Sequence, residues 1–330
     1  MISNLDICLN LIKLIKLILL YIFMMDSIKV FSPASVSNVC CGFDVLGFSI
    51  EGIGDELIIS ESDSNKVNIK KVNGYKVPLH HQKNTASVAA QSLLDFLNIN
   101  RGFDIEINKK IKPCSGIGSS AASAVGAVYG LNKLLGNPLK KEDLLKFALK
   151  GELISSKTAP ADNVAASLHG GLILVNNEEN YNVIKLPRPK NLYAVVHHPL
   201  LEIKTSYSRE ILPKSIDLNI TSKQLASIGG FIHSLHTEDF DLMRLILKDY
   251  IIEKFRFNNI PLFKEIKKIS YSNEVICCSI SGSGPSIFSL VRGYNKAKEL
   301  KSIYDYVYNK NSMDFNSYLT GLNSKGVRIL

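Results

Sequence analysis

The sequence has no tryptophan, no Cys-x-x-C pair and no uninterrupted apolar run long enough to cross a membrane. Its six cysteines are single or adjacent, as in Cys40–Cys41 and Cys277–Cys278, which is not the spacing of a disulfide framework. We interpret them as small packing residues in a reducing compartment. The alternative is a zinc site built from the two adjacent pairs, but the usual spacing of zinc ligands is missing.

A continuous basic stripe is also missing. Lysine and arginine total 39 against 30 acidic residues, so the formal net charge is +9. The lysines are scattered or form short pairs such as Lys70–Lys71 and Lys140–Lys141, with no aromatic residues interleaved. Nucleic acids and acidic membrane surfaces are bound by clustered basic residues, so we expect neither kind of partner.

The chain has 330 residues, of which 46% are hydrophobic and 21% charged, as in ordinary soluble proteins of two domains. Residues 1–25 differ from the rest. Their apolar run Leu17–Met25 is shorter than the roughly 20 residues of a membrane span, and no small-residue cleavage site follows it. We predict that residues 1–25 are an extension outside the fold, or that translation starts at Met24 or Met25. A membrane anchor is the alternative.

The segment Pro113–Gly126, PCSGIGSSAASAVG, predicts a ligand site. It follows an alternating apolar run at 103–107 and precedes a segment of helical character that ends near residue 135, which indicates strand, loop and helix. Gly116 and Gly118 allow a tight turn and close approach of a ligand, and the N–H groups that open a helix bind anions. A triphosphate is the expected ligand. The segment is not a Walker loop, because no lysine follows the glycines, and the alternative is a loop that only caps the helix.

Two further segments of small residues flank it, Pro33–Gly47 (PASVSNVCCGFDVLG) and Ile280–Leu290 (ISGSGPSIFSL). Three such motifs in this order resemble the GHMP kinase superfamily. Within that superfamily the chain is most similar to the homoserine kinases, from roughly residue 27 to the C-terminus. The similarity lies in Asn38 with Gly42-Phe43-Asp44, in Gly151-Glu152 with Ala161-Asp162-Asn163-Val164-Ala165, and in Lys204-Thr205 with Arg209.

The resemblance implies an α+β, two-domain GHMP kinase fold. Residues 26–189 would form an ATP-binding domain like ribosomal protein S5 domain 2, and residues 190–330 a ferredoxin-like domain. Within the first domain, the apolar patterns of Asp55–Ser60 and Lys66–Val72 predict a hairpin or meander. The resemblance also implies a cytoplasmic homodimer.

The reaction that the resemblance implies is the ATP-dependent phosphorylation of the side-chain hydroxyl of L-homoserine to O-phospho-L-homoserine, a step in threonine biosynthesis. Mg²⁺ is implied as the metal, held by Ser120 and Glu152, because this ion binds one or two carboxylates together with water and substrate phosphates. Asn84 would contact the nucleotide base, although asparagine is also a good helix cap. The ATP phosphates would be bound by Pro113, Cys114, Ser115, Gly116, Ile117, Gly118, Ser119, Ser120, Ala121 and Ala122.

The homoserine site implied by the resemblance consists of Asn38, Asp44, Asn163, Thr205, Arg209 and Arg256. Asp44 would pair with the ammonium group of the amino acid. Arg209 and Arg256 would bind its α-carboxylate, for which the guanidinium fork is suited. Taken without the resemblance, Asp44 would be interpreted as a turn cap and Arg209 as a solvated helix residue.

The catalytic residues implied are Asn163, Glu152 and Arg209. Mevalonate-type relatives carry a proposed aspartate base in the region of Asn163, and an amide does not accept a proton at neutral pH. We therefore expect catalysis by proximity and electrostatics, with Asp162 pointing away from the site. The alternatives are another small-alcohol kinase of the mevalonate type and a non-catalytic ligand-binding relative.

Five positions depart from the pattern of the homoserine kinases. Cys40 and Cys114 stand where glycine is usual, Cys41 and Lys254 stand where proline is usual, and Pro160 stands where histidine is frequent. Pro160 removes a group that could form a hydrogen bond, so substrate affinity or specificity is expected to differ there.

Overall fold

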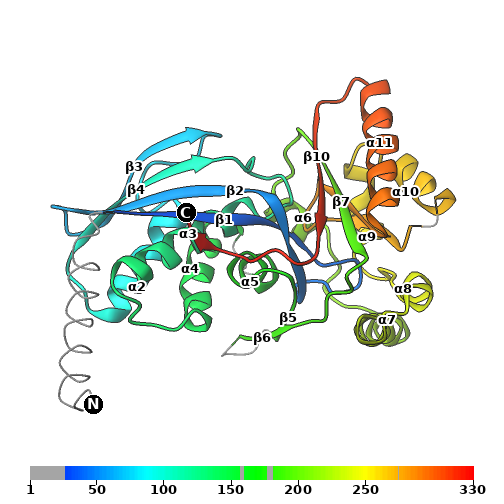
Figure 1. Ribbon diagram of the computed structural model, residues 1–330, viewed down its shortest axis with the longest axis horizontal. Helices are drawn as coiled ribbons and strands as arrows, with labels where there is room; N and C mark the ends of the chain where they lie inside the picture. The colour runs from blue at the N-terminus through cyan, green and yellow to red at the C-terminus, as the bar shows by residue number, and fades with distance from the viewer. Residues whose placement is uncertain (1–26, 157–159, 177–180, 274) are drawn as a thin grey trace, which may run out of the picture.

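The computed structural model describes residues 27–330 apart from 157–159, 177–180 and 274 (Figure 1). The predictions for residues 1–25 lie outside this range. Two β-sheets organise the described chain. The larger sheet has the order β11-β1-β2-β4-β3, and β5 and β6 extend it from β2. Its strands are β1 (Ser27–Ser37), β2 (Leu46–Ser62), β3 (Val67–Gly74), β4 (Gly102–Lys109), β5 (Leu172–Asn176), β6 (Asn182–Lys185) and β11 (Arg328–Ile329).

Four helices cover one side of this sheet, as Figure 1 shows. They are α2 (Thr85–Leu97), α3 (Ser119–Leu134), α4 (Leu145–Ser156) and α5 (Ala161–His169), with the 3₁₀ turn η1 (Glu142–Leu144) before α4. The alternating side chains of β4 explain the layer, because Phe103, Ile105 and Ile107 are all buried against the helices. Helix α3 is rich in alanine and glycine and lies directly against β1 and β2.

The hairpin or meander predicted for Asp55–Ser60 and Lys66–Val72 is wrong. Strand β3 pairs in parallel with β4, with Val67 opposite Phe103, and β4 lies between β2 and β3. Helix α2 makes this possible, because parallel neighbours need a long crossover connection. The period-two pattern identified both strands but carries no information about their partners.

The smaller sheet has the order β10-β7-β9-β8. Its strands are β7 (Leu192–Pro199), β8 (Cys277–Ile280), β9 (Ile287–Arg292) and β10 (Phe315–Gly321). The helices of this part are α6 (Thr205–Glu210), α7 (Leu218–Thr237), α8 (Phe240–Ile246), α9 (Glu253–Arg256), α10 (Phe263–Ser272) and α11 (Tyr294–Lys310), with η2 (Phe257–Asn259) after α9. The α+β fold class is therefore as predicted.

A shared core joins the two sheets. Phe48 of β2 meets Phe288 of β9 edge to face, with ring centroids 5.9 Å apart, and both belong to one buried cluster. The chain passes from the larger sheet to the smaller one between Lys185, where β6 ends, and Leu192, where β7 begins. The terminal strand β11 then pairs with β1 of the larger sheet. The division into residues 26–189 and 190–330 stays a prediction.

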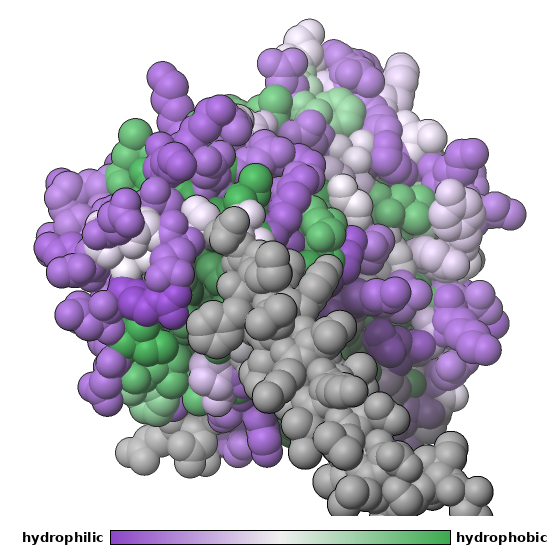
Figure 2. Space-filling model, turned by 60° about the vertical axis from the view of Figure 1, so that its left-hand side comes forward, coloured by the Kyte–Doolittle hydropathy of each residue, from purple (hydrophilic) through white to green (hydrophobic). Residues whose placement is uncertain are grey.

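The surface and the cysteines have the features of an ordinary globular protein. On the face that Figure 2 shows, hydrophilic residues predominate and apolar residues form small separate areas. Cys40, Cys41, Cys277 and Cys278 are buried free thiols. Within the described residues, no group of three or more His, Cys, Asp or Glu side chains is arranged to hold a metal ion, so the zinc alternative gains no support. None of the described helices has both the length and the apolar character needed to cross a bilayer.

Three buried histidines make stability depend on pH. Burial lowers the pKa of His169 and of His198 from 6.5 to about 4, and lowers the pKa of His197 despite its contact with Asp305. Below pH 6.5 the unfolded chain binds protons that the folded chain excludes. We therefore expect each histidine to lower the free energy of unfolding as the pH drops from about 6.5 towards 4, by up to about 1.4 kcal/mol per pH unit. The buried carboxyls of Glu152 and Asp162, whose pKa burial raises to about 7, act in the opposite direction over this range, because the folded chain holds their protons more tightly than the unfolded chain does.

Denaturant titrations at pH 7, 6 and 5 measure this dependence. The stability of His198→Gln should rise relative to that of the native protein as the pH drops from 7 to 5. His233→Gln, which changes an exposed histidine of α7, should keep the native slope. Parallel slopes for His198→Gln and the native protein would contradict the prediction.

Candidate active site

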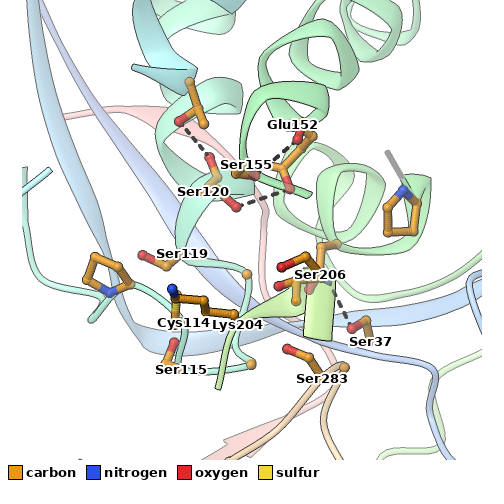
Figure 3. A pocket seen from close by; sticks show the side chains of 18 of the residues that line it. Ser37, Cys114, Ser115, Ser119, Ser120, Glu152, Ser155, Lys204, Ser206 and Ser283 are labelled. Carbon is orange, nitrogen blue, oxygen red and sulfur yellow. Dashed lines mark hydrogen bonds between the residues drawn. The ribbon is translucent and has the colours of Figure 1, made fainter. Parts of the chain in front are cut away.

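A cavity of about 450 Å³ lies where the three small-residue motifs meet (Figure 3). Residues of the loop after β1, of the segment before α3 and of the loop between β8 and β9 all line it. The predicted site residues that line the cavity are Asn38, Asp44, Asn84, Pro113, Cys114, Ser115, Gly116, Gly118, Ser119, Ser120, Glu152, Asn163, Thr205, Arg209 and Arg256. The structure thus brings together residues that are more than 200 positions apart in the sequence.

Three predicted residues do not line the cavity. The side chains of Ile117, Ala121 and Ala122 are buried in the hydrophobic core. Any contact of these residues with ATP would therefore use their backbone groups, which is how the first turn of a helix binds anions.

The predicted phosphate loop, residues 113–118 and called the phosphate loop below, has a shape that requires glycine. Gly116 has φ +79°, and a Cβ there would lie 2.7 Å from the carbonyl oxygens of Gly284 and Ser281. Gly118 has φ +68° and caps α3. Cys114 has φ +58°, a left-handed conformation that glycine adopts at lower cost. This gives a physical reason for the usual glycine at that position.

Hydrogen bonds from the third motif hold this loop in place. Ser281 Oγ donates to the Gly116 carbonyl at 2.7 Å, and Ser286 Oγ donates to the Ser115 carbonyl at 2.7 Å. The backbone N–H of Ser286 donates to the same Ser115 oxygen at 3.3 Å. The loop between β8 and β9 therefore supports the phosphate loop from below the cavity.

A buried ion pair that was not predicted from the sequence ties the end of β4 to the start of α3. Lys109 donates to the Asp55 carboxylate, to the Ser119 carbonyl at 2.6 Å and to Ser123 Oγ at 2.9 Å. Asp55 Oδ1 also accepts the backbone N–H of Ile111 at 3.2 Å. The sequence pattern could have predicted that Lys109 is buried, because it lies two residues after Ile107 and four after Ile105, on the same buried face of β4.

Glu152 of α4 and Ser120 of α3 lie side by side at the cavity, as Figure 3 shows. Ser120 Oγ donates to Glu152 Oε2 at 3.1 Å. The Glu152 side chain is buried, and burial raises its pKa to about 7 against the opposing charge of Lys109. A carboxylate and a hydroxyl beside the start of a helix, where the helix dipole favours negative charge, form a donor set that fits a Mg²⁺ ion bound together with a triphosphate.

Asp44 and Arg209 form a bidentate ion pair at the wall of the cavity. The Nη1 and Nη2 atoms of Arg209 donate to the two Asp44 oxygens at 3.0 and 2.8 Å. Arg209 also lies over the Phe43 ring, 5.5 Å from its centroid. The pair holds one group for each charge of an amino-acid zwitterion.

Arg256 lies next to this pair but is bound differently. Its Nη1 donates to the Gly282 carbonyl at 2.7 Å, and its Nε and Nη2 donate to the Ser208 carbonyl. Burial and the nearby Arg209 charge lower the pKa of Arg256 to about 10. Its predicted contact with a carboxylate stays a prediction, and its visible role is to join helix α6 to the loop between β8 and β9.

The amide of Asn163 is held by two serines of β1. Ser35 Oγ donates to Asn163 Oδ1 at 2.8 Å, and Asn163 Nδ2 donates to Ser37 Oγ at 3.0 Å. The Asn38 side chain holds its own loop, accepting the Asp44 N–H at 3.2 Å and donating to the Gly282 carbonyl at 3.3 Å.

Asp162 does not point away from the site, contrary to the prediction. It lines the cavity, is only 1% exposed, and accepts the backbone N–H groups of Asn38 at 3.2 Å and Asn163 at 2.7 Å. These two hydrogen bonds turn the carboxylate towards the loop after β1. Burial and the Asp44 charge raise the pKa of Asp162 to about 7.

Asn84 caps α2, which was one of its two predicted roles. Its Oδ1 accepts the N–H of Ala86 at 2.9 Å, and its Nδ2 donates to the Pro78 carbonyl at 2.7 Å. Contact with a nucleotide base stays a prediction. Thr205 opens α6 at the cavity, beside Lys204.

Comparison with known proteins agrees with this geometry. The family described as GHMP kinases N terminal domain matches residues 84–171. The homoserine kinase of Chlorobaculum tepidum is 34% identical over 320 residues, covering 93% of this chain and 99% of that protein. The homoserine kinase of Chlorobium phaeobacteroides is 37% identical over 277 residues, covering 80% of this chain and 87% of that protein.

Solved structures give the same result. The crystal structure of homoserine kinase from Cytophaga hutchinsonii has a TM-score of 0.89 and 41% identity, covering 93% of this chain and 98% of that chain. The crystal structure of L. major mevalonate kinase has a TM-score of 0.67 at 15% identity, covering 89% of this chain and 95% of that chain, which shows a common fold alone. The chain belongs to the homoserine kinase family within the GHMP kinases.

Proposed function

We propose that this protein transfers the γ-phosphoryl group of ATP to the side-chain hydroxyl of L-homoserine, giving ADP and O-phospho-L-homoserine for threonine biosynthesis. The observation that carries the proposal is a single cavity that holds both kinds of group the reaction needs. The start of α3 with Glu152 and Ser120 suits a metal-bound triphosphate. The Asp44–Arg209 pair suits a zwitterionic amino acid.

ATP would bind with its phosphates at the phosphate loop and the first turn of α3. Glu152 and Ser120 would hold Mg²⁺, which supplies neutralising charge to the phosphates when bound. The backbone N–H groups at the start of α3 would orient the phosphates, because they have no acceptor within the helix.

Homoserine would replace the Asp44–Arg209 ion pair by two new ion pairs, one with each of these residues. Its ammonium group would bind Asp44 and its carboxylate would bind Arg209, so each protein charge keeps an opposite charge beside it. Asn38, Asn163, Thr205 and Arg256 complete the proposed site. Catalysis would follow from alignment of the hydroxyl with the γ-phosphate and from charge stabilisation.

A comparison of two neighbouring residues tests whether a base is needed. Asp162 and Asn163 both line the cavity, but both oxygens of Asp162 already accept backbone N–H groups. We expect Asn163→Ala to lower kcat by about 100-fold and Asp162→Asn by less than about tenfold. The measurement is kcat at saturating ATP and L-homoserine. A much larger loss for Asp162→Asn, with a changed pH–rate profile, would make Asp162 the base.

The function itself is tested by an assay of ADP release with the full chain. L-homoserine, D-homoserine, mevalonate and shikimate are offered separately with Mg²⁺ and ATP. We expect turnover with L-homoserine alone. Turnover with mevalonate would favour the mevalonate-type alternative, and ATP binding without turnover of any of the four would favour a non-catalytic relative.

A homodimeric state and a cytoplasmic location stay predictions from the resemblance. Sedimentation equilibrium of the purified chain tests the first of them. A single species of 36.5 kDa, the mass of one chain, would contradict the homodimer.

A further inference from the structure

Lys204 lies at the edge of the cavity beside the phosphate loop. It directly precedes α6, and the neighbouring Ile203 N–H donates to the Cys114 carbonyl at 3.2 Å, which attaches this segment to the loop. Figure 3 shows the Lys204 side chain extending from the segment before α6 towards the phosphate loop. Its charge acts on Cys114, opposing the rise that burial causes in the pKa of that thiol.

Most other cationic groups of the cavity are already engaged. Lys109 is paired with the buried Asp55, and Arg209 is paired with Asp44. Arg256 donates to backbone carbonyls. Among the residues that the structure describes, Lys204 has no carboxylate within ion-pair distance.

Lys83 also lines the cavity without such a carboxylate, but its place is different. It precedes Asn84 at the start of α2, and its backbone N–H donates to the His80 carbonyl. The segment that carries Lys204 is instead hydrogen-bonded to the phosphate loop itself. Of the two lysines, Lys204 is therefore the one positioned for the phosphates.

The charge of the ligand requires such a group. A triphosphate has more negative charge than one divalent cation neutralises, and phosphoryl transfer spreads charge over the γ-phosphate oxygens. The carboxylates Glu152 and Asp162 lie on the same cavity and add no positive charge. A flexible ammonium beside the loop, such as that of Lys204, can reach those oxygens as a point charge.

We propose that Lys204 is a further catalytic residue, whose ammonium contacts the γ-phosphate of bound ATP and stabilises the charge that develops during transfer. The inference rests on the proposed function, since it assigns a role within the same reaction. The alternative is a solvated lysine at the rim of the cavity, which would contribute nothing to turnover.

The test compares Lys204→Met, Lys204→Arg and the control Lys214→Met, which removes an exposed lysine beyond α6. We expect Lys204→Met to lower kcat with L-homoserine by about 100-fold and Lys204→Arg to recover at least about tenfold of that loss. Lys214→Met should keep native kcat. Thermal unfolding of all three variants checks that the fold is intact.

Nucleotide binding separates this role from a structural one. Calorimetry with ADP and with a non-hydrolysable ATP analogue should show that Lys204→Met weakens analogue binding by about tenfold and ADP binding by less than about threefold. A kcat within about threefold of the native value, or equal losses for both nucleotides, would overturn the proposal. If the native protein does not phosphorylate homoserine, the proposed function fails, and the comparison of the two nucleotides still decides the role of Lys204.

Discussion

Glu152→Gln is expected to lower kcat by about three orders of magnitude and to remove most of the response of the enzyme to Mg²⁺. The glutamine keeps the size of the side chain and an oxygen for the hydrogen bond from Ser120. It lacks the negative charge that a hard divalent cation requires. The KM for L-homoserine should change little, because the homoserine site is assigned to other residues.

The measurement is a Mg²⁺ titration of turnover at fixed ATP. The matched control is Glu265→Gln, which changes an exposed carboxylate on α10 and should behave as the native protein. Removing a buried carboxylate of raised pKa should not reduce stability, so the variant should unfold at or above the native temperature. A variant that keeps kcat within tenfold would rule out Glu152 as the metal ligand.

Arg209→Met is expected to raise the KM for L-homoserine by at least about 100-fold while the affinity for ATP stays near the native value. Two effects combine in this variant. The substrate carboxylate loses its bidentate partner, and Asp44 loses the group that now neutralises it. Arg209→Lys keeps the charge without the fork, so an intermediate KM is expected.

The substrate analogue 3-aminopropan-1-ol sharpens this test, because it keeps the ammonium and hydroxyl groups and lacks the carboxylate. The native protein should use it poorly, and Arg209→Met should use it about as poorly as the native protein does. Arg244→Met, on an exposed part of α8, is the control. If Arg209→Met impaired the analogue as strongly as homoserine, the residue would not be the carboxylate ligand.

The sequence predicted most of the secondary structure that surrounds the site. Alternating apolar residues identified β4, and the small-residue segment that follows identified the loop and α3. Strand β10 was not predicted, because most of its side chains are half-buried and show no alternation. The strand is stabilised instead by pairing with β7, which involves seven residue pairs in continuous register.

The residues of the site were predicted from motifs. The errors of this prediction concern side chains that have several possible hydrogen-bond partners. The resemblance named Asp44 and Arg209 separately, but nothing in the sequence shows that they bind each other before substrate arrives. Asp162 was misplaced because its direction is decided by the N–H of Asn38, more than 120 positions away. Side-chain direction at such points depends on tertiary contacts that a local pattern does not contain.

The hydrogen bonds of Ser281 and Ser286 to the phosphate loop make the first half of the chain depend on the second half for the shape of this loop. The loop carries the recognisable signature in the first half of the chain, and the groups that fix its shape lie in the second half. A fragment containing residues 84–171 would have the whole matched family segment and would lack those groups. We therefore expect nucleotide binding to require both halves of the chain, so a gene fragment that lacks the second half should keep the signature and lose the activity.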